Sequence, residues 1–261
     1  MKWTHRRSIE HAMPWFLTLS AIVLWQTGCT LFNVPKFILP KPTVIAESLW
    51  EWRTLIALNS LQTFQTTMVG FGIAVVGGVL LGSAIGVSKL IYGGVYPILI
   101  GFNSVPKVAI VPILVIWFGI GTIPAVITSF LIAFFPIAVN VATGLATLEP
   151  ELEDVLRSLG ASQKDILIKV GIPRSLPYFF ASLKIAITMA LIGSVISETI
   201  AANRGIGYLM VAASARLEVP LVFAGLMVIA AMGMGIYAAC ALIERRFTRW
   251  ATRKMDYAMG G

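Results

Sequence analysis

Charged residues are scarce in this sequence of 261 residues. Asp, Glu, Lys and Arg together supply 12% of it, whereas a typical soluble domain carries about 25%. Hydrophobic residues make up 57% and gather in several runs of about 20, the length that spans a bilayer as a helix. The shortage of charge therefore excludes a soluble globular domain and predicts an all-α, polytopic membrane protein.

Residue types that carry catalysis or bind metals are equally few. The two histidines, His5 and His11, both lie in the N-terminal tail, so the sequence offers no metal-binding cluster and no catalytic triad within the membrane. The two cysteines, Cys29 and Cys240, lie in apolar segments, and we interpret them as packing residues rather than a disulfide. No Gly-x-x-x-x-Gly-Lys-Ser/Thr phosphate loop occurs. The sequence therefore predicts no enzyme, no cofactor and no metal, and any ATP hydrolysis must come from a partner subunit.

Six apolar segments are expected to cross the membrane within a single domain that covers residues 1–261. The predicted spans are Trp15–Phe32, Thr66–Val87, Val95–Trp117, Pro124–Leu145, Tyr178–Ile200 and Leu221–Ile243. The first of them also resembles the apolar core of a signal peptide. Because five more spans follow it, we interpret it as an uncleaved signal-anchor helix.

The positions of lysine and arginine predict the orientation of the spans, because cytoplasmic loops carry an excess of both. With both termini inside, fourteen of the 20 basic residues face the cytoplasm, five face outside, and Lys107 lies within a span. The loop at 147–177 is then cytoplasmic, and the loops at 33–65 and 201–220 are external. In the first external loop, Val44–Leu58 is expected to form an amphipathic helix on the outer membrane surface.

The same clustering accounts for the net charge of +8. A basic chain can bind nucleic acid, but here the basic residues lie beside apolar spans, where they set orientation. We therefore expect the lipid bilayer, and no nucleic acid, as the partner of this charge.

Small residues recur every four positions in two spans, a pattern that lets helix backbones approach closely. The repeats are Gly78, Gly82 and Gly86 in the second span, and Ala186, Ala190 and Ser194 in the fifth. We interpret both as packing within one subunit. The alternative is that part of a stripe faces a second copy of the chain.

The predicted cytoplasmic loop reads as two short helices separated by a break. Acidic residues near its start complement the N-terminus of the first helix. Gly160 suits the position that ends this helix, because a left-handed residue is needed there. Ser162 and Asp165 suit the cap of the second helix, which is expected to end at Gly171 and Pro173. The result would be a compact helical protrusion into the cytoplasm.

The loop resembles the ATPase-coupling loop of ABC importer permeases. That loop has the pattern Glu-Ala-Ala, three residues, Gly, nine residues, Ile, one residue, Leu-Pro. The candidate coupling residues in this chain are Asp154, Gly160, Ala161, Ser162, Val170, Ile172 and Pro173. The glycine and the proline match the pattern, and the aliphatic pair before the proline is conservatively replaced. Asp154-Val155-Leu156 stands for Glu-Ala-Ala, so it keeps the charge but carries larger side chains.

Further motifs extend the resemblance over most of the chain. They are Leu39-Pro40-Lys41-Pro42, Trp117-Phe118-Gly119-Ile120-Gly121, Phe135-Pro136, Ser158-Leu159-Gly160-Ala161-Ser162 and Gly205-Ile206-Gly207-Tyr208. Their order is similar to that of the nitrate/sulfonate/taurine/bicarbonate permease subfamily.

This resemblance implies a type I ABC importer permease fold in the bacterial cytoplasmic (inner) membrane. It implies three kinds of protein partner: a second permease copy that forms a homodimer or a similar heterodimer, cytoplasmic ABC ATPase subunits, and an external substrate-binding protein. The substrate expected from the subfamily is a small anion such as a sulfonate or nitrate.

Two other classes of membrane protein were weighed against this interpretation. A secondary transporter would use an intramembrane carboxylate relay and often an internal repeat, but the spans supply Glu198 alone and show no repeat. A membrane enzyme would need clustered catalytic residues, which the sequence lacks.

Ionisable residues inside spans are costly and usually paired or functional. Asn103 and Lys107 are four positions apart, so they share a helix face that could line the translocation path. Alternatively, Pro97 and Pro106 break this segment, and Lys107 extends to the cytoplasmic headgroups. Glu198 lies near the outer end of its span and is either a third path residue or an interfacial or capping carboxylate.

Overall fold

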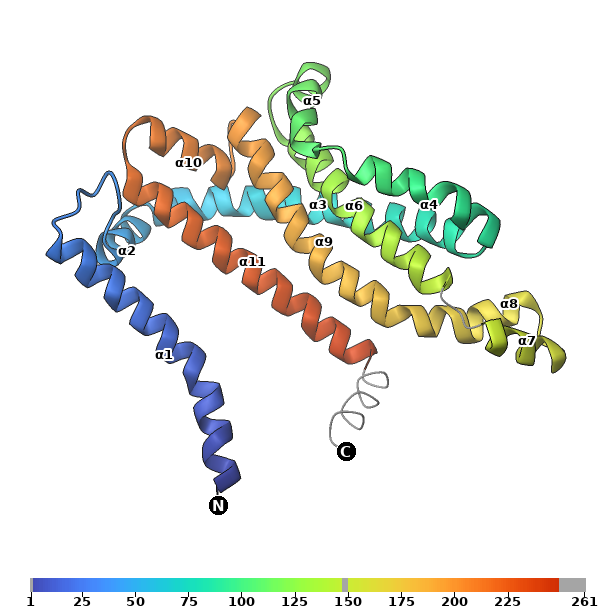
Figure 1. The fold of residues 1–261 in the computed structure, drawn as a ribbon. Helices are drawn as coiled ribbons and strands as arrows, with labels where there is room; N and C mark the ends of the chain where they lie inside the picture. Colours follow the sequence, from blue (N-terminus) through green and yellow to red (C-terminus); the bar gives the residue numbers. More distant parts are fainter. Residues whose placement is uncertain (1, 147–149, 249–261) are drawn as a thin grey trace.

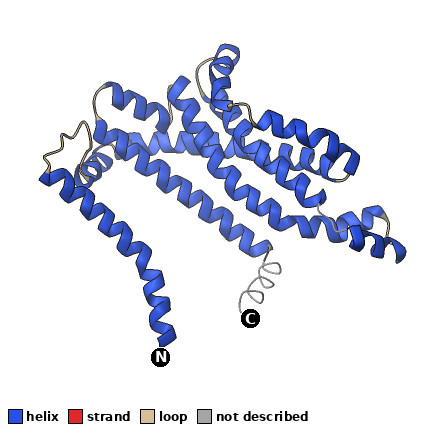
Figure 2. Ribbon diagram, viewed as in Figure 1, coloured by secondary structure: helices blue, strands red, loops and turns tan. Residues whose placement is uncertain are grey.

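The computed structural model describes residues 2–146 and 150–248, and within them every regular element is a helix (Figure 2). In chain order the elements are α1 (Lys2–Leu31), α2 (Pro42–Glu51), α3 (Arg53–Gly86), α4 (Lys89–Asn103), η1 (Lys107–Ile110), α5 (Val111–Phe118), α6 (Thr122–Ala146), α7 (Pro150–Ser158), α8 (Gln163–Ile166), η2 (Leu167–Gly171), α9 (Ile172–Ala201), α10 (Ile206–Ala215) and α11 (Val219–Phe247). The helices α3, α6, α9 and α11 lie side by side, α1 points away from them, and α7 and α8 project from one end of the bundle (Figure 1).

Four helical segments are long and apolar enough to cross a membrane: α3, α6, α11 and the continuous segment Lys164–Ala201. They correspond to four of the six predicted spans. The predicted third span corresponds to α4 and α5, which together are apolar enough but bent by 73°. The predicted first span lies in α1, which is long but includes the polar N-terminal tail and is less apolar on average than α3 or α6. Its membrane crossing stays a prediction.

The alternative that proline breaks the predicted span Val95–Trp117 is confirmed at Pro106, whereas Pro97 lies inside α4. The helix α4 ends at Asn103, a short 3-10 helix follows, and α5 begins at Val111. Pro106 explains the break, because proline lacks an N–H and disfavours helical geometry in the residue before it. Pro106 itself is extended, with φ −68° and ψ 101°. The third span is therefore a bent pair of helices.

The first external loop is also more helical than predicted. The helix expected over Val44–Leu58 is divided at Trp52, where α2 ends and α3 begins, so residues 53–65 extend the second span. Arg53 stabilises this junction, because its guanidinium donates a hydrogen bond of 2.9 Å to the Trp50 carbonyl and lies 4.8 Å from the Trp50 ring centroid. The second span consequently continues beyond its apolar stretch into the predicted external region.

The helix α6 packs directly against both α3 and α9, and the small-residue stripes make these contacts. A Cβ atom added at Gly82 would lie 2.6 Å from the Ala138 carbonyl oxygen, which is shorter than an ordinary contact, so these backbones approach too closely for a side chain. On α9, Ala186 and Ala190 are fully buried and belong to one hydrophobic cluster with Ala133 and Ile137 of α6. The interpretation of these stripes as packing within one subunit is confirmed.

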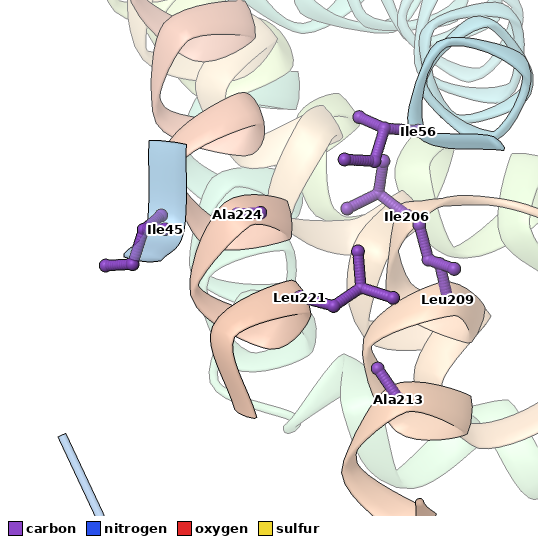
Figure 3. Close-up of a cluster of buried hydrophobic side chains, with 7 residues drawn as sticks. All are labelled: Ile45, Ile56, Ile206, Leu209, Ala213, Leu221 and Ala224. Atoms are coloured by element: carbon purple, nitrogen blue, oxygen red, sulfur yellow. The ribbon is translucent and has the colours of Figure 1, made fainter. Parts of the chain in front are cut away.

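A hydrophobic cluster at the predicted outer end holds the short helices α2 and α10 against the spans α3 and α11. Its buried members are Ile45, Ile56, Ile206, Leu209, Ala213, Leu221 and Ala224 (Figure 3). At the opposite end, Lys184 of α9 forms an ion pair of 2.6 Å with Glu244 of α11, and Phe180 stacks on Phe247. Side-chain contacts thus join α11 to α3 at one end of the bundle and to α9 at the other.

Candidate functional site

The break between α7 and α8 is a helix-ending turn built on Gly160. The N–H of Gly160 donates to the Arg157 carbonyl at 2.9 Å, and the N–H of Ala161 donates to the Leu156 carbonyl at 3.0 Å. These two bonds form the Schellman pattern that requires a left-handed residue. Gly160 has φ +84°, and no described atom lies within 4 Å of the place where its Cβ would be. The predicted role of this glycine is confirmed, and its requirement is one of backbone conformation rather than of space.

Ser162 caps the second helix of the loop, as predicted. Its hydroxyl oxygen accepts a hydrogen bond of 3.1 Å from the Asp165 N–H, and its hydroxyl donates to the Asp165 carboxylate. Asp165 also forms an ion pair of 2.8 Å with Lys169 in the next turn. These contacts fix where the chain enters the helix that follows Gly160.

The prediction that this second helix ends at Gly171 and Pro173 is wrong. The chain stays helical from α8 through a π-helical turn, η2, into α9. The Ile172 N–H donates to the Leu167 carbonyl, five residues earlier. A proline has no N–H and its ring crowds the carbonyl four residues before it, and the wider π turn before Pro173 accommodates this residue. The loop is therefore joined rigidly to the fifth span.

The described part of the loop presents apolar side chains at its tip. Leu159 is 78% exposed and Val155 is 55% exposed, although both lie outside the apolar spans. An open cleft between the two short helices is lined by Leu156, Leu159, Gly160, Ala161, Asp165, Ile166, Lys169 and Val170. Exposed apolar groups rimmed by charges are typical of a protein-docking surface.

The predicted coupling residues lie in four places in and beside this cleft. Asp154 is exposed on α7, outside the cleft, and residues 160–162 form the turn. Val170 lines the cleft, whereas Ile172 and Pro173 lie at the start of α9. The first residues of the predicted loop, 147–149, lie outside the described residues.

Asn103 and Lys107 contact each other despite the break between their helices. The Lys107 ammonium donates to the Asn103 side-chain oxygen at 2.9 Å and also to the Asn103 carbonyl. It lies 4.9 Å from the centroid of the Phe135 ring. Because Lys107 follows the C-terminus of α4, its charge also complements the helix dipole. Both interpretations of Lys107, on the path or at the headgroups, stay predictions.

Glu198 has a different environment from Lys107. Its side chain is buried, with 2% of the residue exposed, and its carboxylate accepts three hydrogen bonds. The donors are the Thr63 hydroxyl at 2.8 Å, the Gly207 N–H at 3.1 Å and the Thr66 hydroxyl at 3.4 Å. Among the described residues no ion pair joins Glu198 to Lys107. These contacts correspond to the capping role weighed from the sequence.

The partners of Glu198 were missed in the sequence because they were assigned to an external loop or its edge. Asn59 and Thr63 are four residues apart and Thr66 follows three later, so all three share one face of α3. The Asn59 side-chain oxygen accepts from the Gly205 N–H at 2.8 Å, and the Thr63 hydroxyl oxygen accepts from the Ile206 N–H at 2.9 Å. We call Asn59, Thr63, Thr66 and Glu198 the α10 cap, because Asn59, Thr63 and Glu198 accept from the first N–H groups of α10 and Thr66 donates to Glu198.

Metal ligands do not gather in the part of the chain that the structure describes. Within residues 2–146 and 150–248, no group of three His, Cys, Asp or Glu side chains is arranged to hold an ion. The site therefore comprises an apolar turn at one end of α9, a capped helix at the other, and a lysine on the bent helix pair.

Comparison with known proteins gives a consistent set of relatives. Residues 74–249 match the family described as binding-protein-dependent transport system inner membrane component. The riboflavin transport system permease protein RibX of Chloroflexus aurantiacus is 30% identical over 231 residues, which cover 88% of this chain and 86% of RibX. The taurine transport system permease protein TauC of Escherichia coli is 30% identical over 261 residues, with coverage of 95% and 92%.

A solved structure has the same fold. One chain of the MetNI methionine ABC transporter, in an inward-facing conformation, superposes with a TM-score of 0.64 and 21% identity. The superposition covers 76% of this chain and 98% of that chain. The helical arrangement described above is therefore that of an importer permease.

Proposed function

Because the chain belongs to the family of binding-protein-dependent transport system inner membrane components, and is thus a membrane permease of an ABC transporter, we propose that its α7–α8 turn receives the movement of a cytoplasmic ATPase. The type I importer permease fold predicted from the sequence is confirmed by the MetNI superposition. The family assignment leaves the alternative of a secondary transporter without support.

The observation that carries the coupling role is the exposed turn at Gly160. Its left-handed glycine places Leu159 at the tip, where a side chain that is 78% exposed has no partner within the described subunit that would cover it. The Ser162 cap and the Asp165–Lys169 ion pair hold the second helix at a fixed angle to this tip. A turn that is both apolar and rigid suits docking to another protein, because little side-chain and backbone entropy is lost on binding.

The proposed assembly contains two permease subunits, cytoplasmic ATPases and an external binding protein. The lysine and arginine distribution supports the inside location of both termini and of the loop at 147–177. The family description supports the binding protein, because it names binding-protein-dependent transport. A second copy of this chain is the simplest source of the other permease half.

The proposed substrate is a small anion such as a sulfonate or nitrate. Taurine in the name of one relative supports a sulfonate, although a relative named for riboflavin is equally similar in sequence. The residue proposed to favour an anion is Lys107, which carries a positive charge on the bent helix pair. Its neighbour Asn103 supplies amide donors for the same ligand. Glu198, the third path candidate, is buried as a member of the α10 cap.

Substitution at Gly160 tests the coupling role. A β-branched Gly160→Val strains the left-handed turn, whereas Gly160→Asn suits the same conformation and meets no described atom within 4 Å. In proteoliposomes that contain the ATPase and binding protein, we expect Gly160→Val to abolish uptake and Gly160→Asn to retain it. Both variants should still insert in the membrane. Normal uptake by Gly160→Val, with the ATPase bound, would show that the turn has no coupling role.

A further inference from the structure

The start of α10 is held by side chains from two other helices. The backbone N–H groups of residues 205, 206 and 207 donate to Asn59, Thr63 and Glu198 respectively. Helix N-termini usually receive such bonds from a residue in their own chain segment. Here the capping groups come from α3 and α9, so the start of α10 is attached to both spans.

The glycines of this segment bring α10 into direct contact with α9. A Cβ added at Gly205 would lie 2.2 Å from the Glu198 carboxyl carbon, and one added at Gly207 would lie 2.4 Å from the Val195 carbonyl oxygen. At both glycines the packing is too close for α9 and α10 to slide past each other. The Glu198 carboxyl group lies at the N-terminus of α10, where the helix dipole favours its ionised form.

The helical segment that contains Glu198 is joined at its other end to the α7–α8 turn. Lys164–Ala201 is continuous over 38 residues. At 1.5 Å per residue, the 34 residues from its start to Glu198 correspond to about 51 Å. A continuous helix of this length transmits displacement from one end to the other, whereas a loop would absorb it.

We propose that Glu198, together with Thr63 and Asn59, is a positioning residue that makes α10 move with α9. ATPase movement received at the α7–α8 turn would then reach α10, on the side from which substrate enters. The inference rests on the proposed coupling function, and it extends that function from the cytoplasmic turn to the opposite end of the subunit. The purely structural alternative is that the α10 cap only stabilises the fold.

The experiment compares two reporter positions in the full complex of permease, ATPase and binding protein in nanodiscs. After Cys29 and Cys240 are replaced by serine, single cysteines are introduced at Leu159, in the turn, and at Val211, which is 46% exposed on α10. The rate of maleimide labelling is measured with and without ATP and vanadate. In the chain with an intact α10 cap, we expect nucleotide to change the labelling rate at both positions.

Removal of the carboxylate should separate the two reporters. With Glu198→Ala, we expect the nucleotide response at Leu159 to persist and that at Val211 to fall by about tenfold, because a charge-assisted, buried set of hydrogen bonds is lost. Uptake should fall with the Val211 response while ATP hydrolysis continues. The control is Ser182→Ala, a buried hydroxyl on α9 that bonds within its own helix, and it should change neither reporter. A full Val211 response in Glu198→Ala would overturn the inference.

A second pair of variants decides the question if Glu198→Ala fails to assemble. Thr63→Ser keeps the hydroxyl that accepts from Ile206 and donates to Glu198, whereas Thr63→Val removes it. We expect the Val211 response to survive in the first and to be lost in the second, and equal responses would overturn the inference. An absent response at Leu159 in the chain with an intact cap would instead refute the proposed coupling function. The two failures are therefore distinguishable.

Discussion

Gly82 of α3 lies where the backbones of α3 and α6 approach each other closely, and Gly82→Ala tests that contact. The added Cβ would lie 2.6 Å from the Ala138 carbonyl oxygen and 2.8 Å from the Val141 Cβ. One of these atoms belongs to the backbone and the other is attached directly to it. Rotation of a neighbouring side chain therefore cannot relieve the clash, and the two helices must separate.

The size of the effect follows from these distances. Ordinary van der Waals contacts begin at 3.4 Å, so α3 and α6 would have to move apart by about 0.8 Å, and overpacking of this kind costs about 1–3 kcal/mol of folding free energy. A matched control lies on the same helix. No described atom comes within 4 Å of a Cβ added at Gly72, and Gly72→Ala should stabilise the protein by up to about 1 kcal/mol because alanine favours helix.

The free energy of unfolding is measured for both variants by titrating the protein in mixed dodecylmaltoside and SDS micelles. We expect Gly82→Ala to unfold at lower SDS fraction than the unsubstituted chain and Gly72→Ala to unfold at the same or a higher fraction. Equal stability of the two variants would refute the close approach of α3 and α6. It would also reopen the possibility that the glycine stripe faces a second copy.

The remaining predictions concern the path and the topology. Lys107→Gln should reduce uptake by about 10- to 150-fold, since a charged hydrogen-bonding group is worth about 1.5–3 kcal/mol. Lys107→Arg should keep part of the activity, and unchanged uptake by Lys107→Gln would remove this residue from the path. A cysteine at Ser162, in a chain without its natural cysteines, should react with a membrane-impermeant maleimide only after the cells are opened. A cysteine at exposed Lys36 is the control and should react in sealed cells. Labelling at Ser162 in sealed cells would contradict the predicted orientation.

The sequence predicted most of the helices because their apolar runs, and the glycines and prolines between them, are strong local signals. Gly160 and Ser162 were placed correctly in the turn because each satisfies a backbone requirement within a few residues of itself. The stripe that contains Gly82 likewise predicted close helix packing, although its partner, α6, became evident only from the structure.

The differences arise where the effect of a proline depends on its local geometry, or where residues far apart in the sequence meet. Pro106 breaks the third span as one alternative predicted, and the helices on either side are bent by 73°, whereas Pro97 stays within α4. Pro173 was read as a helix end, but the π turn before it lets the helix continue. The α10 cap was missed because Thr63 meets Glu198, and Asn59 meets Gly205, only after three helices pack together, at separations of more than 130 residues.

The π turn η2 also sets the direction in which the turn at Gly160 faces. A π turn completes one rotation with one residue more than an α turn, so the wide turn at Leu167–Gly171 absorbs one residue without further rotation. In a regular α-helix the same residue would rotate the chain by about another 100°. If this segment relaxed to regular α-helix with its length unchanged, Leu159 and Gly160 would therefore face about that angle away from their present direction, although every side chain of the turn would be kept. The geometry of a single helical turn thus specifies which partner surface the tip can meet.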